Sequence, residues 1–170
     1  TTGTSNTLIG GLTGDALTTG ADNTAIGTVA LTADTLGSRS VAVGRGTLGA
    51  QNFTTATNTY NTAVGYDAGG TVTTGIQNTL IGGLAGDALS TSEKNVAVGY
   101  LALSAEDSHG QNTAVGWSAL AVQNAGATGN NTALGYNAGA AVTTGISNTL
   151  IGAFAGDALT DADNNVAMGK

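Results

Sequence analysis

The chain has 170 residues, of which 28 are Gly, and it contains no Pro and no Cys. Only 9% of its residues are charged and its formal net charge is −7, which excludes a nucleic-acid backbone as an expected partner because phosphate contacts need clustered Lys and Arg. The absence of Cys excludes disulfides and thiolate metal sites, and no apolar run approaches the roughly 18 residues of a membrane span, so we expect no direct membrane insertion.

A motif of Asn, Thr or Val, Ala or Leu, an aliphatic residue and Gly recurs from one end of the chain to the other. Its opening residues are Asn6, Asn23, Ser40, Asn61, Asn78, Asn95, Asn112, Asn131, Asn148 and Asn165. The steps between them are 17, 17, 21, 17, 17, 17, 19, 17 and 17 residues, and the fourth residue after each opening residue is always Gly. A period this regular is typical of a solenoid, in which each repeat forms one coil.

A second, longer period is present in the same sequence. Residues 61–77 match residues 131–147 at 12 of 17 positions, whereas the adjacent coils 78–94 and 95–111 match each other at only 5. The full repeating unit therefore contains four coils, or about 70 residues.

Each motif predicts a short β-strand. A β-branched residue, then Ala or Leu, then an aliphatic residue form a period-2 pattern, and the frequent Gly residues would cost a helix about 1 kcal/mol each. We therefore expect an all-β protein, a parallel β-solenoid of about ten 17-residue coils. A spacing of about 4.8 Å between coils would make a rod on the order of 45 Å long.

The two faces of the predicted strand are both apolar. We expect the aliphatic third residue after the opening Asn to fill the thin interior, with Gly permitting the bend that follows. The second residue is then expected to face a neighbouring chain, since a small apolar strip needs a partner to cover it. That predicted interface contains Leu8, Ala25, Ala42, Ala63, Leu80, Ala97, Ala114, Ala133, Leu150 and Ala167.

The stretches "NVAVGYLALSA" and "NTAVGWSALAV" resemble the head repeats of YadA-like trimeric autotransporter adhesins, which form a left-handed β-roll. They are also similar to the "NTAIGYxAL" repeats of phage-type tail fibres and bacterial surface fibres. The resemblance covers nearly all of the chain. It implies a homotrimer, with the Ala/Leu strip as the trimer interface, and a role in adhesion or host recognition. Since the pattern runs to both ends and no Met begins the chain, we expect residues 1–170 to be one β-roll domain cut from a longer extracellular fibre, on a cell surface or a virion.

Six aromatic residues are the candidate binding residues. Rings directly after the motif Gly could stack on sugars if they face solvent, but the favoured alternative is that they pack across a trimer interface or cover the edge of the roll. Two insertions, 51–60 and 123–130, are predicted surface loops, because insertions in repeat proteins map to one face. The candidates are Phe53 and Tyr60 in the first insertion, and Tyr66, Tyr100, Trp117 and Tyr136 after the Gly.

The acidic residues are expected to serve turns, and we predict no metal site and no cofactor. Asp15, Asp87 and Asp157 recur in "GDAL" without the set of oxygen ligands that calcium needs. His109, the only His, lies in a polar turn. A glycosidase built on carboxylates such as Glu106 would need a cleft with a pair separated by about 5–10 Å.

That carboxylate set consists of Glu93, Glu106 and Asp107. A thin coil offers little room for a cleft, so we predict that the protein is not an enzyme.

The leading hypothesis is a non-catalytic segment of a trimeric fibre that attaches to a surface or recognises a cell-surface glycan or protein receptor. An ice- or surface-binding solenoid is the first alternative and a purely structural shaft the second. Ice binding would require an exposed Thr array, and the interruptions by Val41, Val96 and Val166 indicate an inward or interface position instead. The array consists of Thr7, Thr24, Thr62, Thr79, Thr113, Thr132 and Thr149.

Overall fold

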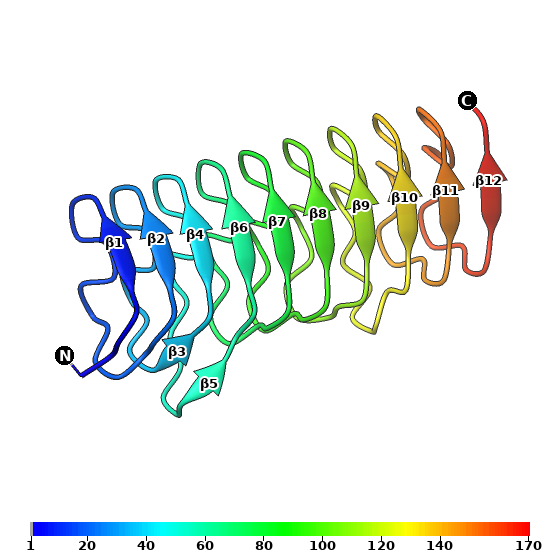
Figure 1. Ribbon diagram of the computed structural model, residues 1–170. Coiled ribbons are helices and arrows are strands. Elements are labelled where there is room, and N and C mark those ends of the chain that lie inside the picture. The colour runs from blue at the N-terminus through cyan, green and yellow to red at the C-terminus, as the bar shows by residue number, and fades with distance from the viewer. Residues whose placement is uncertain (1) are drawn as a thin grey trace.

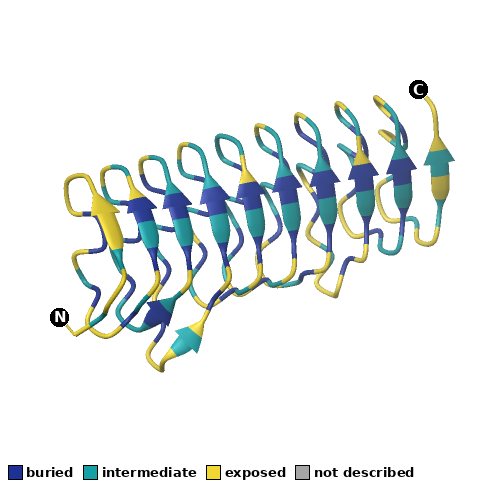
Figure 2. Ribbon diagram, viewed as in Figure 1, coloured by how far each residue is buried: buried dark blue, intermediate teal, exposed yellow. Residues whose placement is uncertain are grey.

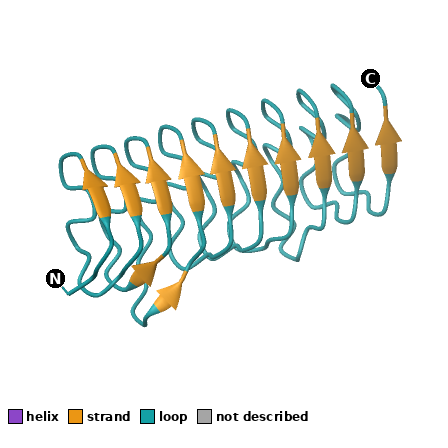
Figure 3. Ribbon diagram, viewed as in Figure 1, coloured by secondary structure: helices purple, strands orange, loops and turns teal. Residues whose placement is uncertain are grey.

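The computed structural model describes residues 2–170, and this part of the chain is all-β (Figure 3). The chain winds into a β-solenoid whose coils stack along one axis, with the two termini at opposite ends (Figure 1). Among the described residues, no helix is long and apolar enough to cross a membrane. The predicted fold class, a parallel β-solenoid of about ten coils, is confirmed.

One strand from each coil joins a ten-stranded parallel sheet in the order β1-β2-β4-β6-β7-β8-β9-β10-β11-β12. The strands are three residues long, and each begins one residue after the opening Asn or Ser. Their bounds are β1 Thr7–Ile9, β2 Thr24–Ile26, β4 Val41–Val43, β6 Thr62–Val64, β7 Thr79–Ile81, β8 Val96–Val98, β9 Thr113–Val115, β10 Thr132–Leu134, β11 Thr149–Ile151 and β12 Val166–Met168. The pairing is strictly in register, so that equivalent motif residues lie side by side along the whole stack.

The opening Asn forms a ladder that links each coil to the next. Asn78 Oδ1 accepts the backbone N–H of Asn95 at 3.0 Å, and Asn78 Nδ2 donates to the carbonyl oxygen of Ser92 at 2.9 Å. The coil that opens with Ser40 interrupts the ladder: the backbone N–H of Asn61 donates to Thr59 Oγ1 at 3.4 Å, and Asn61 Nδ2 donates to Gln51 Oε1 at 2.9 Å. The Asn side chain thus satisfies backbone groups at a coil corner that would otherwise be buried without partners.

Two features require Gly at the fourth position after the opening residue: a positive φ and the close approach of the backbone of the next coil. Gly82 has a φ of 134°, which only Gly adopts readily. A Cβ at this position would also lie 2.5 Å from the carbonyl oxygen of Gly99 in the next coil. The next residue, Gly83, has no such restriction, because a Cβ there would meet only the ring of Tyr100 at 3.5 Å.

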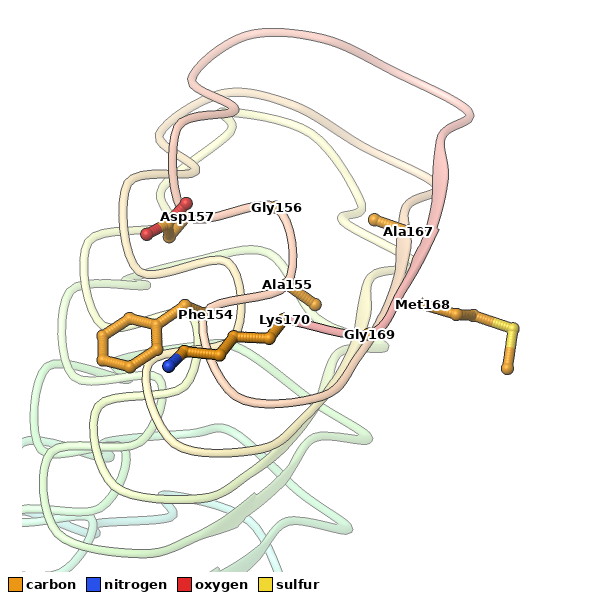
Figure 4. A pocket seen from close by; sticks show the side chains of 8 residues that line it. All are labelled: Phe154, Ala155, Gly156, Asp157, Ala167, Met168, Gly169 and Lys170. Carbon is orange, nitrogen blue, oxygen red and sulfur yellow. The ribbon is translucent and has the colours of Figure 1, made fainter.

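The second residue of each strand, not the third, points into the solenoid. In the strand Thr79–Ile81 the middle residue Leu80 is buried while Ile81 is 40% exposed. Figure 4 shows the same arrangement at the last coil, where Ala167 points inward and Met168 points away. The expectation that the aliphatic third residue fills the interior is therefore wrong.

The assignment of the Ala/Leu strip to a subunit interface is wrong for the same reason. These side chains form the hydrophobic core of a single chain (Figure 2). The interior is thin, so a small side chain fits where the facing wall is close. Leu8, at the first strand, is exposed, and Ala167, at the last, is partly buried against the core. The eight members with no exposed surface are Ala25, Ala42, Ala63, Leu80, Ala97, Ala114, Ala133 and Leu150.

The four-coil period has its physical cause in this core. Leu80, inside the sheet, lies against Gly86, where a Cβ would meet a Leu80 methyl at 2.7 Å, so a large strand residue requires Gly on the facing wall. In two of the four coils of the repeating unit, Ala in the strand is combined with a buried Leu on the facing wall, eight residues after the opening residue. The same two coils have a buried polar residue three positions after that Leu. The polar residues are Asp34, Gln51, Glu106 and Gln123, at positions where other coils have Leu17, Val72, Leu89 and Val142.

The first insertion supplies one strand of a small second sheet, which lies where the second and third coils end (Figure 1). It pairs β3 (Gly37–Ser38) with β5 (Thr57–Asn58) in parallel. The insertion therefore continues the stack at its corner and is not a free loop.

Candidate binding surfaces

The outward side of the ten-stranded sheet, here the sheet face, consists of the first and third residues of each strand. The first residues form a threonine column, in which Thr is replaced by Val in three strands. The third residues form an aliphatic column of Ile, Val, Leu and Met. None of these twenty positions carries a charge. In the single chain, the aliphatic column includes side chains such as Ile9 and Leu134, which are 58% and 47% exposed.

The threonine column lies on the outside of the solenoid. Its residues Thr24 and Val96 begin strands whose middle residue is buried, and both are partly exposed. The inward position inferred from the three Val residues is therefore wrong, and the interface position stays a prediction. The face therefore carries an outward, partly exposed Thr array that is interrupted by Val in three strands.

A second surface is formed by the predicted aromatic residues that follow the motif Gly. Tyr66, Tyr100, Trp117 and Tyr136 are all about half exposed. The structure adds Phe154, which is 37% exposed and contacts Tyr136 edge-on at 5.3 Å between ring centroids. These five residues are called the aromatic row below. Sequence reasoning missed Phe154 because it stands one position later in its coil, after Ala153.

Three rings of the aromatic row, Tyr100, Trp117 and Tyr136, stack on one another. Trp117 lies between Tyr136, at 5.1 Å and 12° between ring planes, and Tyr100, at 6.3 Å and 24°. Tyr66 is separated from this stack by Gly83, and the Arg45 guanidinium covers it at 5.6 Å. The faces of Trp117 are therefore directed at its neighbours, and ring edges face solvent in the middle of the stack.

The two aromatic residues of the first insertion behave differently. Phe53 is 6% exposed, with its backbone N–H donating to Asp34 Oδ1 at 3.3 Å, so its assignment as a binding residue is wrong. Tyr60 is exposed, and its hydroxyl accepts from Arg39, which also pairs with Asp22 at 3.7 Å.

Two buried acid–amide corners were missed by the sequence analysis, which did not single out Asp34, placed Glu106 in a turn and placed Gln51 and Gln123 in surface loops. At the first corner, Asp34 Oδ2 accepts from Gln51 Nε2 at 2.6 Å and Asp34 Oδ1 accepts from the Gly37 N–H at 3.0 Å. At the second, Glu106 and Gln123 are both fully buried, and Glu106 Oε1 accepts the His109 N–H at 3.0 Å.

Burial raises the pKa of Glu106 to about 7, with the nearby Asp107 carboxylate adding to the effect. An alignment of the coils with one another could have revealed both corners, because Asp34 and Glu106 occupy a position that other coils fill with Leu or Val.

The predicted carboxylate set is only partly brought together. Glu106 and Asp107 lie close to His109, whereas Glu93 forms an ion pair with Lys94 at 2.7 Å. A hollow of about 220 Å³ is found elsewhere, at the last coils (Figure 4). It is lined by a single carboxylate, Asp157, and so does not provide the acid pair of a glycosidase.

Comparison with models of known protein families, with curated proteins and with solved structures finds no match. The resemblance of the short motif to adhesin and tail-fibre repeats therefore stays a prediction.

Proposed function

We propose that this chain is a non-catalytic segment of an extracellular fibre, in which three copies pack through the sheet face and the outer surface attaches to a cell-surface receptor. The observation that carries the proposal is the sheet face itself: ten strands in register with no charged side chain and with a continuous aliphatic column.

Packing of the sheet face would remove an apolar surface from water. Burying an Ile, Val or Leu side chain is worth about 1.5–3 kcal/mol, and contiguous exposed apolar patches of this length mark interaction sites in soluble proteins. A symmetric oligomer repeats one contact on each copy, so that every chain would cover its own aliphatic column.

The aromatic row would remain accessible in such an assembly. Phe154, its last ring, points to the side of the coil opposite Met168 of the aliphatic column (Figure 4). Exposed Tyr and Trp edges with Arg45 beside them suit a glycan or protein receptor of low affinity per site. Three identical surfaces on one fibre would multiply weak contacts into firm attachment. The expected location is outside the cell, on a cell surface or a virion.

An ice- or surface-binding solenoid is the second candidate, because the outward threonine column favours it. Seven of the ten first strand positions are Thr, held at the regular spacing of a parallel sheet, about 4.8 Å. In this case the sheet face would stay uncovered in a monomer and would slow the growth of ice crystals.

A charge placed on the sheet face tests the proposal. Ile81 and Leu134 are both exposed residues of the aliphatic column. Replacing both by Lys should reduce the assembly seen by analytical ultracentrifugation from three chains to one, because like charges cannot be buried together without partners. The matched control is Thr28→Lys with Thr144→Lys, two exposed positions outside the sheet face. Equal masses for both double variants, with unchanged circular dichroism, would contradict packing through this face.

A further inference from the structure

Three possible ligand groups converge in the turn that follows the buried Glu106. A carboxylate oxygen of Glu106, one of Asp107 and a ring nitrogen of His109 all lie within 4.8 Å of one another. The distance from His109 Nδ1 to Glu106 Oε1 is 3.9 Å. Glu106 is buried, His109 is partly exposed and Asp107 is exposed, so the cluster opens from the corner of the coil to solvent.

The bonding of Glu106 is incomplete, which distinguishes this corner from its counterpart. Glu106 has no exposed surface, and neither its Oε2 nor the Nε2 of the buried Gln123 at the same corner has a hydrogen-bond partner. At the equivalent corner both oxygens of Asp34 accept hydrogen bonds, from the N–H groups of Gly37 and Phe53 and from Gln51. A buried carboxylate without full pairing costs free energy unless another group, such as a cation, compensates it.

In the described part of the chain, no Lys or Arg side chain pairs with Glu106. Among the described residues, the ion pairs of Lys and Arg go to other acids: Lys94 pairs with Glu93, and the two Arg residues with Asp22 and Asp67. The corner therefore has two carboxylates and one imidazole without a Lys or Arg partner.

We propose that Glu106, Asp107 and His109 bind a first-row divalent transition metal of the zinc class, one ion per chain. Zinc takes carboxylate oxygen and imidazole nitrogen at about 2.0–2.2 Å, so its ligand atoms lie roughly 3.3–3.6 Å apart, and the cluster reaches this geometry by small side-chain rotations. The imidazole favours zinc or nickel over calcium, which takes six to eight oxygen ligands. Water would complete the coordination. The proposal revises the prediction that the chain has no metal site, and it is independent of the proposed fibre function.

Titration of the metal-stripped 170-residue chain with zinc chloride tests the site. Isothermal calorimetry should show one zinc per chain, and the imidazole resonances of His109, the only His, should shift while calcium chloride has no effect. His109→Gln and Glu106→Gln should each weaken binding at least tenfold, whereas Asp161→Asn, an exposed acid in another coil, should not.

Circular dichroism of each variant checks that the fold is retained. His109→Gln changes a partly exposed side chain, so it tests the site even if the buried Glu106→Gln variant unfolds. Binding that both ligand variants leave unchanged, or a stoichiometry far from one, would show an adventitious ion only and would overturn the proposal.

Discussion

The opening Asn and the Gly four residues later connect adjacent coils through the backbone. Asn78 accepts the N–H of Asn95 and donates to the carbonyl of Ser92, all of them fully or almost fully buried. Gly82 allows its backbone to approach that of Gly99 more closely than any side chain would permit. The two positions recur because every coil boundary presents the same pair of requirements.

The paired glycines Gly82 and Gly83 give a matched test of this account. Gly82→Ala should destabilise the protein by at least about 1–3 kcal/mol, since Ala is strained at a φ of 134° and its Cβ would collide with the next coil. Gly83→Ala should change stability by less than about 1 kcal/mol, because its Cβ would make an ordinary contact. Urea unfolding compares the two variants, and equal losses would contradict the role given to the motif Gly.

Asp87 predicts a pH dependence of stability. Burial raises the pKa of Asp87 above its ordinary value of 3.8, and the Asp67 carboxylate raises it further. The folded state therefore holds this proton to higher pH than the unfolded state does. The resulting stabilisation is fully present below about pH 4 and is lost as pH rises through the raised pKa.

Asp87→Asn removes this contribution. The variant should gain stability relative to the parent chain as pH rises from 3 to 7, measured by thermal unfolding across that range. Asp157→Asn is the control, since Asp157 occupies the equivalent "GDAL" position but is exposed. A difference between Asp87→Asn and the parent chain that does not vary with pH would contradict the assignment.

At the scale of the strand, the structure reverses the orientation that the sequence predicted. The repeat, the coil boundaries, the strand positions and the parallel stacking all follow from the period and the β-branched residues. The sequence did not predict which face of each strand points inward. Leu80 and Ile81 are both apolar, so alternation alone does not say which of them is buried. The deciding factor is the thin interior, where Ala is small enough to face the opposite wall.

The polar corners show a second limit of the sequence. Glu106 was placed in a turn and Gln123 in a surface loop, yet both occupy core positions, Gln123 in a longer coil and Glu106 in the coil before it. The buried Phe53 was misassigned because an insertion was taken as a free loop, whereas part of it pairs into a second small sheet. Alignment by position within the coil, instead of by local polarity, would have pointed to Glu106 and Gln123.

Truncation of neighbouring strand residues tests the orientation. Leu80→Ala should cost about 2–5 kcal/mol, the range for a cavity in a packed core. Ile81→Ala, one residue later and 40% exposed, should cost less than about 1 kcal/mol in a single chain. Thermal unfolding of the dissociated chain distinguishes them, and a larger loss for Ile81→Ala would reverse the orientation again.

At the scale of the whole molecule, the solenoid has a sheet face without charge and, at its last coil, an aromatic ring directed to the opposite side (Figure 4). A chain with this arrangement can assemble through one surface and bind through the other. The proposed fibre uses both, whereas an ice-binding monomer would use the sheet face alone. Oligomeric state therefore separates the two functions.

The most direct test is the mass of the 170-residue chain in solution by multi-angle light scattering. Packing of three copies through the sheet face predicts a single species of three times the 16.3 kDa chain mass at micromolar concentration. A monodisperse species of one chain mass would contradict the proposed assembly, and it would leave the exposed threonine and aliphatic columns as a surface for ice or another flat partner.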